Sequence, residues 1–185
     1  MKIWISIVSI SLLCSALWAD TTMIGRFTTA GGQDLGLCTK YGEVWGFGLD
    51  QDHPIVEVGK VVPVGTAYLG GYLSYWSGSK KLYAELFGVY SKDFGKLRFK
   101  AKGFAYLPLN GGKIALGSDE ISLAYKVGKN VRLGGLVHLW KTDGEAVLTA
   151  AGFQMECNLG KKTSLTLRHT QGDLGQTRLF ISQTF

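Results

Sequence analysis

Residues 176–185 read QTRLFISQTF, and their side chains alternate between two faces. Leu179 and Phe185 fall on one face, and Arg178 and Thr184 fall on the other. A period of two residues is typical of a half-buried β-strand. The residues before it, from position 162, predict a partner strand and a tight turn, so we expect the chain to finish as an antiparallel strand pair.

The same alternation recurs along the chain at intervals of about 8–12 residues, the spacing of all-β sandwiches and barrels. It is clearest in residues 96–107, KLRFKAKGFAYL, where Arg98, Lys100 and Lys102 alternate with apolar or small residues. We therefore expect an all-β fold of about ten strands, with eight as the alternative count. The expected strands cover residues 35–49, 55–62, 66–76, 81–91, 96–107, 119–127, 131–140 and 145–159, followed by the C-terminal pair.

The composition and the N-terminus place the chain in an exported class. Hydrophobic residues make up 46% of the sequence, too many for a disordered protein, and charged residues only 18%, below the roughly 25% usual in soluble domains. Residues 1–19 predict a signal peptide, because Lys2 is followed by a short apolar run and a cleavage site before Asp20. Without Lys2 the formal net charge falls from +6 to +5. We expect residues 20–34 to form a periplasmic lead-in and residues 35–185 to form one domain.

The C-terminal strand, with Phe185 as its last residue, resembles the final strand of bacterial outer-membrane β-barrels. In that family the terminal aromatic strand is the signal that the barrel-assembly machinery reads. Gln183 departs from the pattern, because an aromatic or aliphatic residue is usual there. The resemblance implies an antiparallel, up-and-down transmembrane β-barrel in the outer membrane of a Gram-negative bacterium. Its expected partners are outer-membrane lipids and, through Phe185, the assembly machinery.

Alternation alone does not tell which face of each strand points into the barrel. A membrane barrel has apolar residues outside and polar residues inside, whereas a soluble lipocalin-like barrel has the reverse and binds a hydrophobic ligand. The apolar phase of Phe185 favours the membrane arrangement, as do aromatic residues near strand ends on the apolar phase, where interface girdles lie. These aromatic residues are Tyr41, Trp45, Tyr75, Tyr90 and Tyr125. The soluble periplasmic carrier is the alternative.

In the membrane arrangement the lumen is lined by charged residues, and bases outnumber acids. This predicts a structural barrel or a narrow porin-like channel whose interior favours a small anionic solute. Alternatively, bases near strand ends extend to water without binding anything. The expected lumen residues are Lys40, Glu85, Arg98, Lys100, Lys102, Lys126, Arg132, His138, Glu156, Arg168 and Arg178.

Catalytic and metal chemistry find little support in the sequence. No His or Cys pair has metal-ligand spacing, so neither a metal nor a cofactor is expected. His169 is similar in position to the His of the His-x-Ser motif in outer-membrane lipid A deacylases, but Gln171 stands where the Ser belongs. A lipid-modifying hydrolase that uses His169 and Thr170 is the third hypothesis. The bases alternate along strands instead of forming a patch, so no nucleic-acid partner is expected.

Overall fold

The computed structural model describes residues 22–28, 32–39, 42–49 and 52–184. Over these ranges the chain forms twelve β-strands that close into a barrel. The strands are β1 (Thr22–Thr28), β2 (Gly32–Cys38), β3 (Glu43–Phe47), β4 (Ile55–Val64), β5 (Ala67–Trp76), β6 (Lys81–Phe94), β7 (Leu97–Pro108), β8 (Ala115–Lys126), β9 (Val131–Thr142), β10 (Val147–Asn158), β11 (Thr163–Gly172) and β12 (Thr177–Thr184).

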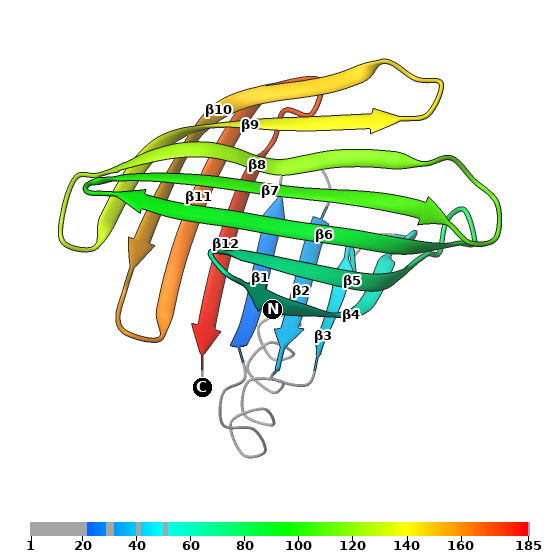
Figure 1. Cartoon of the computed structure of the whole chain (residues 1–185), viewed down its shortest axis with the longest axis horizontal. Helices are drawn as coiled ribbons and strands as arrows, with labels where there is room; N and C mark the ends of the chain where they lie inside the picture. Colours follow the sequence, from blue (N-terminus) through cyan, green and yellow to red (C-terminus); the bar gives the residue numbers. More distant parts are fainter. Residues whose placement is uncertain (1–21, 29–31, 40–41, 50–51, 185) are drawn as a thin grey trace.

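Each strand pairs antiparallel with its sequence neighbours, and β1 pairs with β12 to close the ring, which confirms the predicted antiparallel up-and-down barrel. Figure 1 shows the long strands β6, β7 and β8 crossing the front of the barrel, with β1 and β12 side by side. The wall is uneven, because β6 has 14 residues and β3 has 5. We call the end that holds Thr22 and Thr184, which are paired with each other, the terminal end.

Hairpin turns at the terminal end are short. The β4–β5 and β6–β7 turns consist of residues 65–66 and 95–96. Gly65 and Gly95 have φ values of 62° and 63°, a left-handed conformation that glycine adopts without a Cβ penalty. At the opposite end, loops such as residues 109–114 are longer.

Two boundary predictions were wrong, and together they explain why the barrel has twelve strands in the described part of the chain instead of about ten. Residues 20–34 are not a lead-in, because β1 and the start of β2 lie there and complete the ring. Residues 35–49 are not one strand but the end of β2 and all of β3, separated by a turn in which the Thr39 amide donates to the Gly42 carbonyl at 2.9 Å. Strands this short give too few alternations to stand out in the sequence.

The turn between β2 and β3 also reverses the phase of the side chains. Asp34, an even-numbered residue, is buried in β2, whereas Trp45, Phe47 and Glu43 share the inward face of β3. The Trp45 indole nitrogen donates to the Glu43 carboxylate at 3.1 Å. Trp45 is therefore a lumen residue, and its predicted place in an outward aromatic girdle was wrong.

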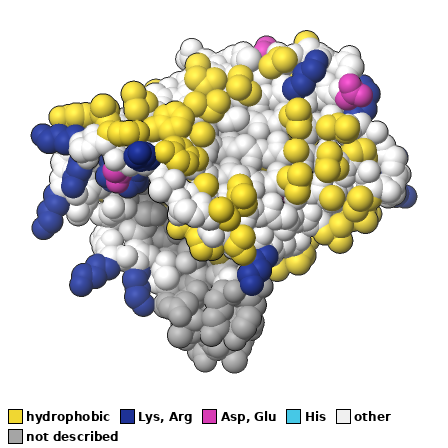
Figure 2. Space-filling view, in the orientation of Figure 1, with side chains coloured by type: hydrophobic (Ala, Val, Ile, Leu, Met, Phe, Trp, Pro, Cys, Tyr) yellow, Lys and Arg dark blue, Asp and Glu magenta, His cyan; other side chains and the backbone are white. Residues whose placement is uncertain are grey.

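The outward face of the barrel is apolar. Leu86, Leu123 and Phe153 expose 57%, 53% and 54% of their surface, and Tyr75 and Tyr125 are exposed on the same face. Figure 2 shows apolar side chains spread over the visible wall, with Lys and Arg mostly at its margins. A soluble carrier with an oily interior requires the reverse arrangement, so that alternative was wrong. Among the residues that the structure describes, no helix is long and apolar enough to cross a membrane.

Some sequence-based predictions concern residues outside the described ranges. They are the signal peptide over residues 1–19, the lumen position of Lys40, the girdle position of Tyr41 and the terminal aromatic Phe185.

Candidate functional site

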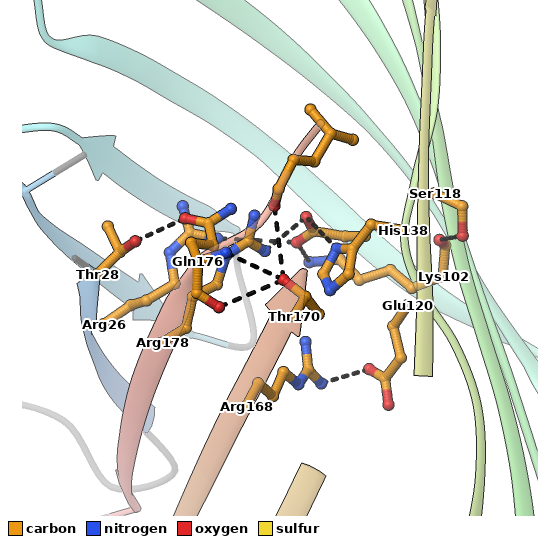
Figure 3. Close-up of polar contacts among 12 residues, drawn as sticks. Arg26, Thr28, Lys102, Ser118, Glu120, His138, Arg168, Thr170, Gln176 and Arg178 are labelled. Carbon is orange, nitrogen blue, oxygen red and sulfur yellow. Dashed lines mark hydrogen bonds and ion pairs between the residues drawn. The ribbon is translucent and has the colours of Figure 1, made fainter. Parts of the chain in front are cut away.

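A β-bulge in β8 organises the interior of the barrel. In the pairing with β9, Ser118 faces Leu139 and Ile121 faces Val137, so that Asp119 and Glu120 together oppose a single residue, His138. A bulge of this kind places two consecutive side chains where a regular strand would place one. The Ser118 hydroxyl donates to the Lys102 carbonyl at 2.7 Å on the neighbouring strand (Figure 3).

Because of the bulge, both carboxylates reach into the lumen instead of pointing to opposite faces. Glu120 is completely buried, and the Asp119 side chain is 18% exposed. Three of their ion-pair partners, Arg26, Arg168 and Arg178, come from β1, β11 and β12, which are not neighbours of β8 in the sheet. Such contacts can form only across the interior.

Asp119 lies close to polar groups from four different strands. Its Oδ1 accepts from Arg178 on β12 at 2.9 Å and lies 3.9 Å from His138 Nδ1 on β9. Its Oδ2 lies 3.4 Å from Lys102 Nζ on β7 and 3.7 Å from Arg26 Nη1 on β1. Since β7 and β1 stand opposite each other in the ring, this one carboxylate connects facing walls of the barrel.

Glu120 makes a second, parallel set of contacts. Arg168 Nη2 on β11 lies 2.6 Å from Glu120 Oε2, and Lys100 Nζ on β7 lies 2.9 Å from the same oxygen. The Ser122 hydroxyl donates to Glu120 Oε1 at 2.8 Å. The carboxylate is thus held between two cations on separate walls.

Three arginines gather on the wall made by β11, β12 and β1. Arg168 and Arg178 are direct register partners, so two like charges stand side by side on one face, an arrangement that is unfavourable unless anions compensate it. The guanidinium groups of Arg168 and Arg26 lie 4.7 Å and 5.9 Å from the Phe180 ring centre. Arg26 also pairs with Asp34 on β2. Figure 3 shows how this group faces Glu120 and His138.

We refer to these residues as the central cluster. It consists of five bases (Arg26, Lys100, Lys102, Arg168 and Arg178), three acids (Asp34, Asp119 and Glu120) and His138. Cations therefore outnumber carboxylates at the place where side chains from opposite walls meet.

A second group of charges lies near the terminal end. Arg98 Nε donates to Asp93 at 2.8 Å, and Arg98 Nη1 lies 3.6 Å from Glu156. Arg132 Nη2 lies 3.7 Å from Asp93. Lys126, at the end of β8, is exposed.

Toward the opposite end, a buried acid is held by hydroxyl groups. Glu57 Oε1 accepts from Ser74 and from Tyr106, each at 2.9 Å, and Glu57 is 4% exposed. Glu85 is also buried, and its carboxyl group lies next to that of Glu57 inside the barrel.

Aromatic rings pack together inside the lumen next to this acid. Their centres are 4.9–6.5 Å apart, and they come from strands β5, β6, β7 and β9 beside the loops of that end. Because the rings pack against one another, they narrow one side of the lumen instead of lining an open surface. The rings belong to Trp76, Tyr83, Phe104, Tyr106 and Trp140.

Several buried polar atoms around the central cluster have no hydrogen-bond partner among the described residues. Arg168 Nε and His138 Nε2 are two of them, although these residues expose only 6% and 3% of their surface. Gln154 Oε1 is another, and Gln154 is the register partner of Arg168 on β10. A buried polar atom without a partner is costly, so these positions mark places where water or a solute is expected to bind.

The predicted lumen residues separate into distinct groups. Lys100, Lys102, His138, Arg168 and Arg178 meet in the central cluster. The remaining described members lie elsewhere, with Arg98, Arg132, Glu156 and Lys126 toward the terminal end and Glu85 beside Glu57.

The acids of the central cluster were missed by the sequence reasoning. Asp119 was assigned to the first position of the strand expected over residues 119–127, because the bulge interrupts the alternation. A signal was present, since the outward apolar residues change from even (Leu116) to odd (Ile121 and Leu123) across the acidic pair. Arg26 was missed because it fell in the supposed lead-in.

The geometry around His169 does not assemble a hydrolase site. His169 Nδ1 lies 2.9 Å from Thr177 Oγ1, and its ring is 5.5 Å from the Phe153 ring on the outward face. Thr170 is 3% exposed and belongs to the inward face, where its hydroxyl donates to the Gln176 carbonyl at 3.3 Å. The two residues therefore point to opposite sides of the wall and do not act as a base and nucleophile pair.

Comparison with known proteins gives a fold-level likeness. No protein-family model matches the chain, and neither does any curated protein sequence. The chain resembles solved bacterial outer-membrane porins. It is 14% identical to the KdgM porin, with a TM-score of 0.56 over 89% of this chain and 99% of the other.

Two further structures show the same likeness. KdgM in complex with disordered oligogalacturonate is 13% identical, with a TM-score of 0.58 and the same coverage. The NanC porin is 8% identical, with a TM-score of 0.50 over 89% of this chain and 98% of the other. At such low identity the comparison shows a common porin-like barrel.

Proposed function

We propose that the protein is an outer-membrane channel for small anionic solutes. The observation that carries this proposal is the excess of cations in the central cluster, where five bases from both walls surround three carboxylates. A water-filled passage lined by a surplus of one charge concentrates ions of the opposite charge.

The outer wall supports a membrane location. Its exposed apolar side chains suit contact with lipid acyl chains, and a closed barrel leaves no unpaired strand edge in the membrane. Outer-membrane barrels have short periplasmic turns, so we propose that the terminal end, with the turns at residues 65–66 and 95–96, faces the periplasm. Outer-membrane lipids and the barrel-assembly machinery, which would read the strand ending in Phe185, are the proposed partners.

The nature of the solute follows from the same charges. KdgM was solved in complex with oligogalacturonate, a saccharide whose units each carry a carboxylate. The guanidinium groups of Arg168 and Arg178 suit carboxylate recognition, because their N–H groups match the geometry of two carboxylate oxygens. An acidic saccharide is therefore the solute class that we propose for this channel. A purely structural barrel is the second candidate, since the ion pairs of Asp119 cross the lumen.

The ionic selectivity of the reconstituted protein tests the proposal. In a planar bilayer with a KCl gradient, we expect a zero-current potential whose sign reports higher permeability for chloride than for potassium. Lys100→Gln removes a lumen cation and lowers this selectivity. Lys113→Gln is the control, because Lys113 pairs with Glu145 at 2.9 Å between two loops and more than half of each side chain is exposed.

Selectivity for potassium would contradict the proposed function. A wild-type barrel that inserts without conducting would favour the structural candidate. An equal effect of Lys100→Gln and Lys113→Gln would show that surface charge, and not the lumen, sets the selectivity.

A further inference from the structure

We propose that Asp119 and Glu120 are tethered counter-anions that occupy the anion site of the lumen, and that a permeating carboxylate passes by exchanging with them. This inference rests on the proposed anion channel and assigns a specific role to the two acids of the bulge.

The bulge in the backbone of β8 decides where the two acids point. On a regular strand, consecutive residues point to opposite faces, so one of these two acids would face the lipid. The extra residue in β8 brings both into the lumen, opposite His138. The bulge thus adds a second negative charge to the passage without placing one in the apolar outer wall.

The ion pairs of the two acids define the position of the anion site. Asp119 and Glu120 receive their donors from bases on facing walls, at distances between 2.6 and 3.7 Å. A carboxylate on a solute at the same height would be offered the same bases. The two side chains therefore hold the positions that a dicarboxylate would take.

Arg168 has a hydrogen-bond donor that the two acids do not use. Arg168 Nη2 donates to Glu120, while its buried Nε–H has no hydrogen-bond partner among the described residues. An entering carboxylate can bind such an atom before Glu120 or Asp119 leaves. Exchange in this order never exposes a bare pair of arginines, which would be unfavourable for the register partners Arg168 and Arg178.

The double variant Asp119→Asn/Glu120→Gln removes the tethered charges and keeps the side-chain sizes. We expect the chloride-to-potassium permeability ratio to rise about tenfold, since each lost charge lay within a few ångströms of the passage. Glu156→Gln is the matched control, because Glu156 is a lumen acid that pairs with Arg98 at 3.6 Å outside the central cluster. We expect it to change the ratio far less.

Block of the chloride current by citrate tests the exchange itself. With the tethered acids neutralised, citrate no longer competes with them, so its blocking constant should fall about tenfold in the double variant, since nearby charges are only weakly screened in the lumen. In Glu156→Gln it should stay near the wild-type value. An unchanged citrate constant in the double variant would overturn the inference.

The single variants Asp119→Asn and Glu120→Gln guard against a double variant that does not fold, with heat-modifiable gel migration as the check for a closed barrel. Each is expected to shift the permeability ratio and the citrate constant in the same direction by a smaller factor. If the wild type is selective for anions and neither single variant shifts either quantity, the inference fails while the proposed function stands. If the wild type is selective for cations, the proposed function itself has failed.

Discussion

Replacing Arg168 with methionine tests whether the ion pairs of the lumen hold the barrel together. Arg168 is 6% exposed, and its Nη2 lies 2.6 Å from Glu120, which is fully buried. Breaking a buried ion pair by removing one partner costs about 3–5 kcal/mol. Lys100 stays 2.9 Å from the same oxygen of Glu120 and compensates part of the charge, whereas the contact of Arg168 with the Phe180 ring is lost. We therefore expect Arg168→Met to lower the free energy of unfolding by about 3 kcal/mol.

Urea unfolding of the barrel in lipid vesicles, followed by tryptophan fluorescence, measures this change. Trp76 and Trp140 pack in the lumen and report loss of the interior. A double-mutant cycle with Glu120→Gln isolates the pairwise part of the effect. We expect a coupling free energy of about 2 kcal/mol between the two positions, because the neutral partner in the double variant no longer needs the guanidinium group.

Lys113→Met is the control for this experiment, since its pair with Glu145 is exposed and exposed pairs contribute little to stability. A loss below about 1 kcal/mol for Arg168→Met, with no coupling to Glu120, would refute the reasoning, because it would mean that Glu120 is not buried against this arginine.

Other variants test the two faces of the wall and the buried acid. Leu123→Arg places a charge on the outward face, where it should cost about 2–4 kcal/mol if Leu123 lies near the bilayer midplane, measured by the same urea unfolding; an unchanged stability would contradict lipid contact. Tyr106→Phe removes the 2.9 Å hydrogen bond to Glu57 and should cost about 1–2 kcal/mol, and a neutral result would show that Glu57 is satisfied without it. Tyr125→Phe changes an exposed hydroxyl on the outward face and serves as its control.

The sequence predicted the long strands well because alternation over many residues leaves little choice of phase. In β7 every second residue from Arg98 to Lys102 was expected inside, and the pairing of Lys100 with Glu120 places it there. The short strands β1, β2 and β3 were not predicted with these bounds. Strands such as β3, with 5 residues, carry too few alternations, and the turn before Glu43 reverses their phase.

The centre of the candidate site depends on features that a period of two cannot reveal. The bulge that turns both Asp119 and Glu120 inward is visible only as a change of phase between Leu116 and Ile121. Contacts across the lumen, such as Arg26 with Asp119, depend on closure of the ring between β1 and β12. The sequence therefore predicted four of the five bases, whereas the bulge and the closure of the barrel, which bring the acids and Arg26 to them, could not be predicted.

Thiol accessibility of neighbouring positions on β7 tests the central claim most directly. In a Cys14→Ser/Cys38→Ser/Cys157→Ser background, Lys100→Cys and Ala101→Cys place single thiols on the inward and outward faces of the same strand. In lipid vesicles, a membrane-impermeant, negatively charged methanethiosulfonate should modify the Lys100→Cys protein and leave the Ala101→Cys protein unmodified. Modification of the Ala101→Cys protein alone would show that the charged face of β7 does not line a water-filled lumen.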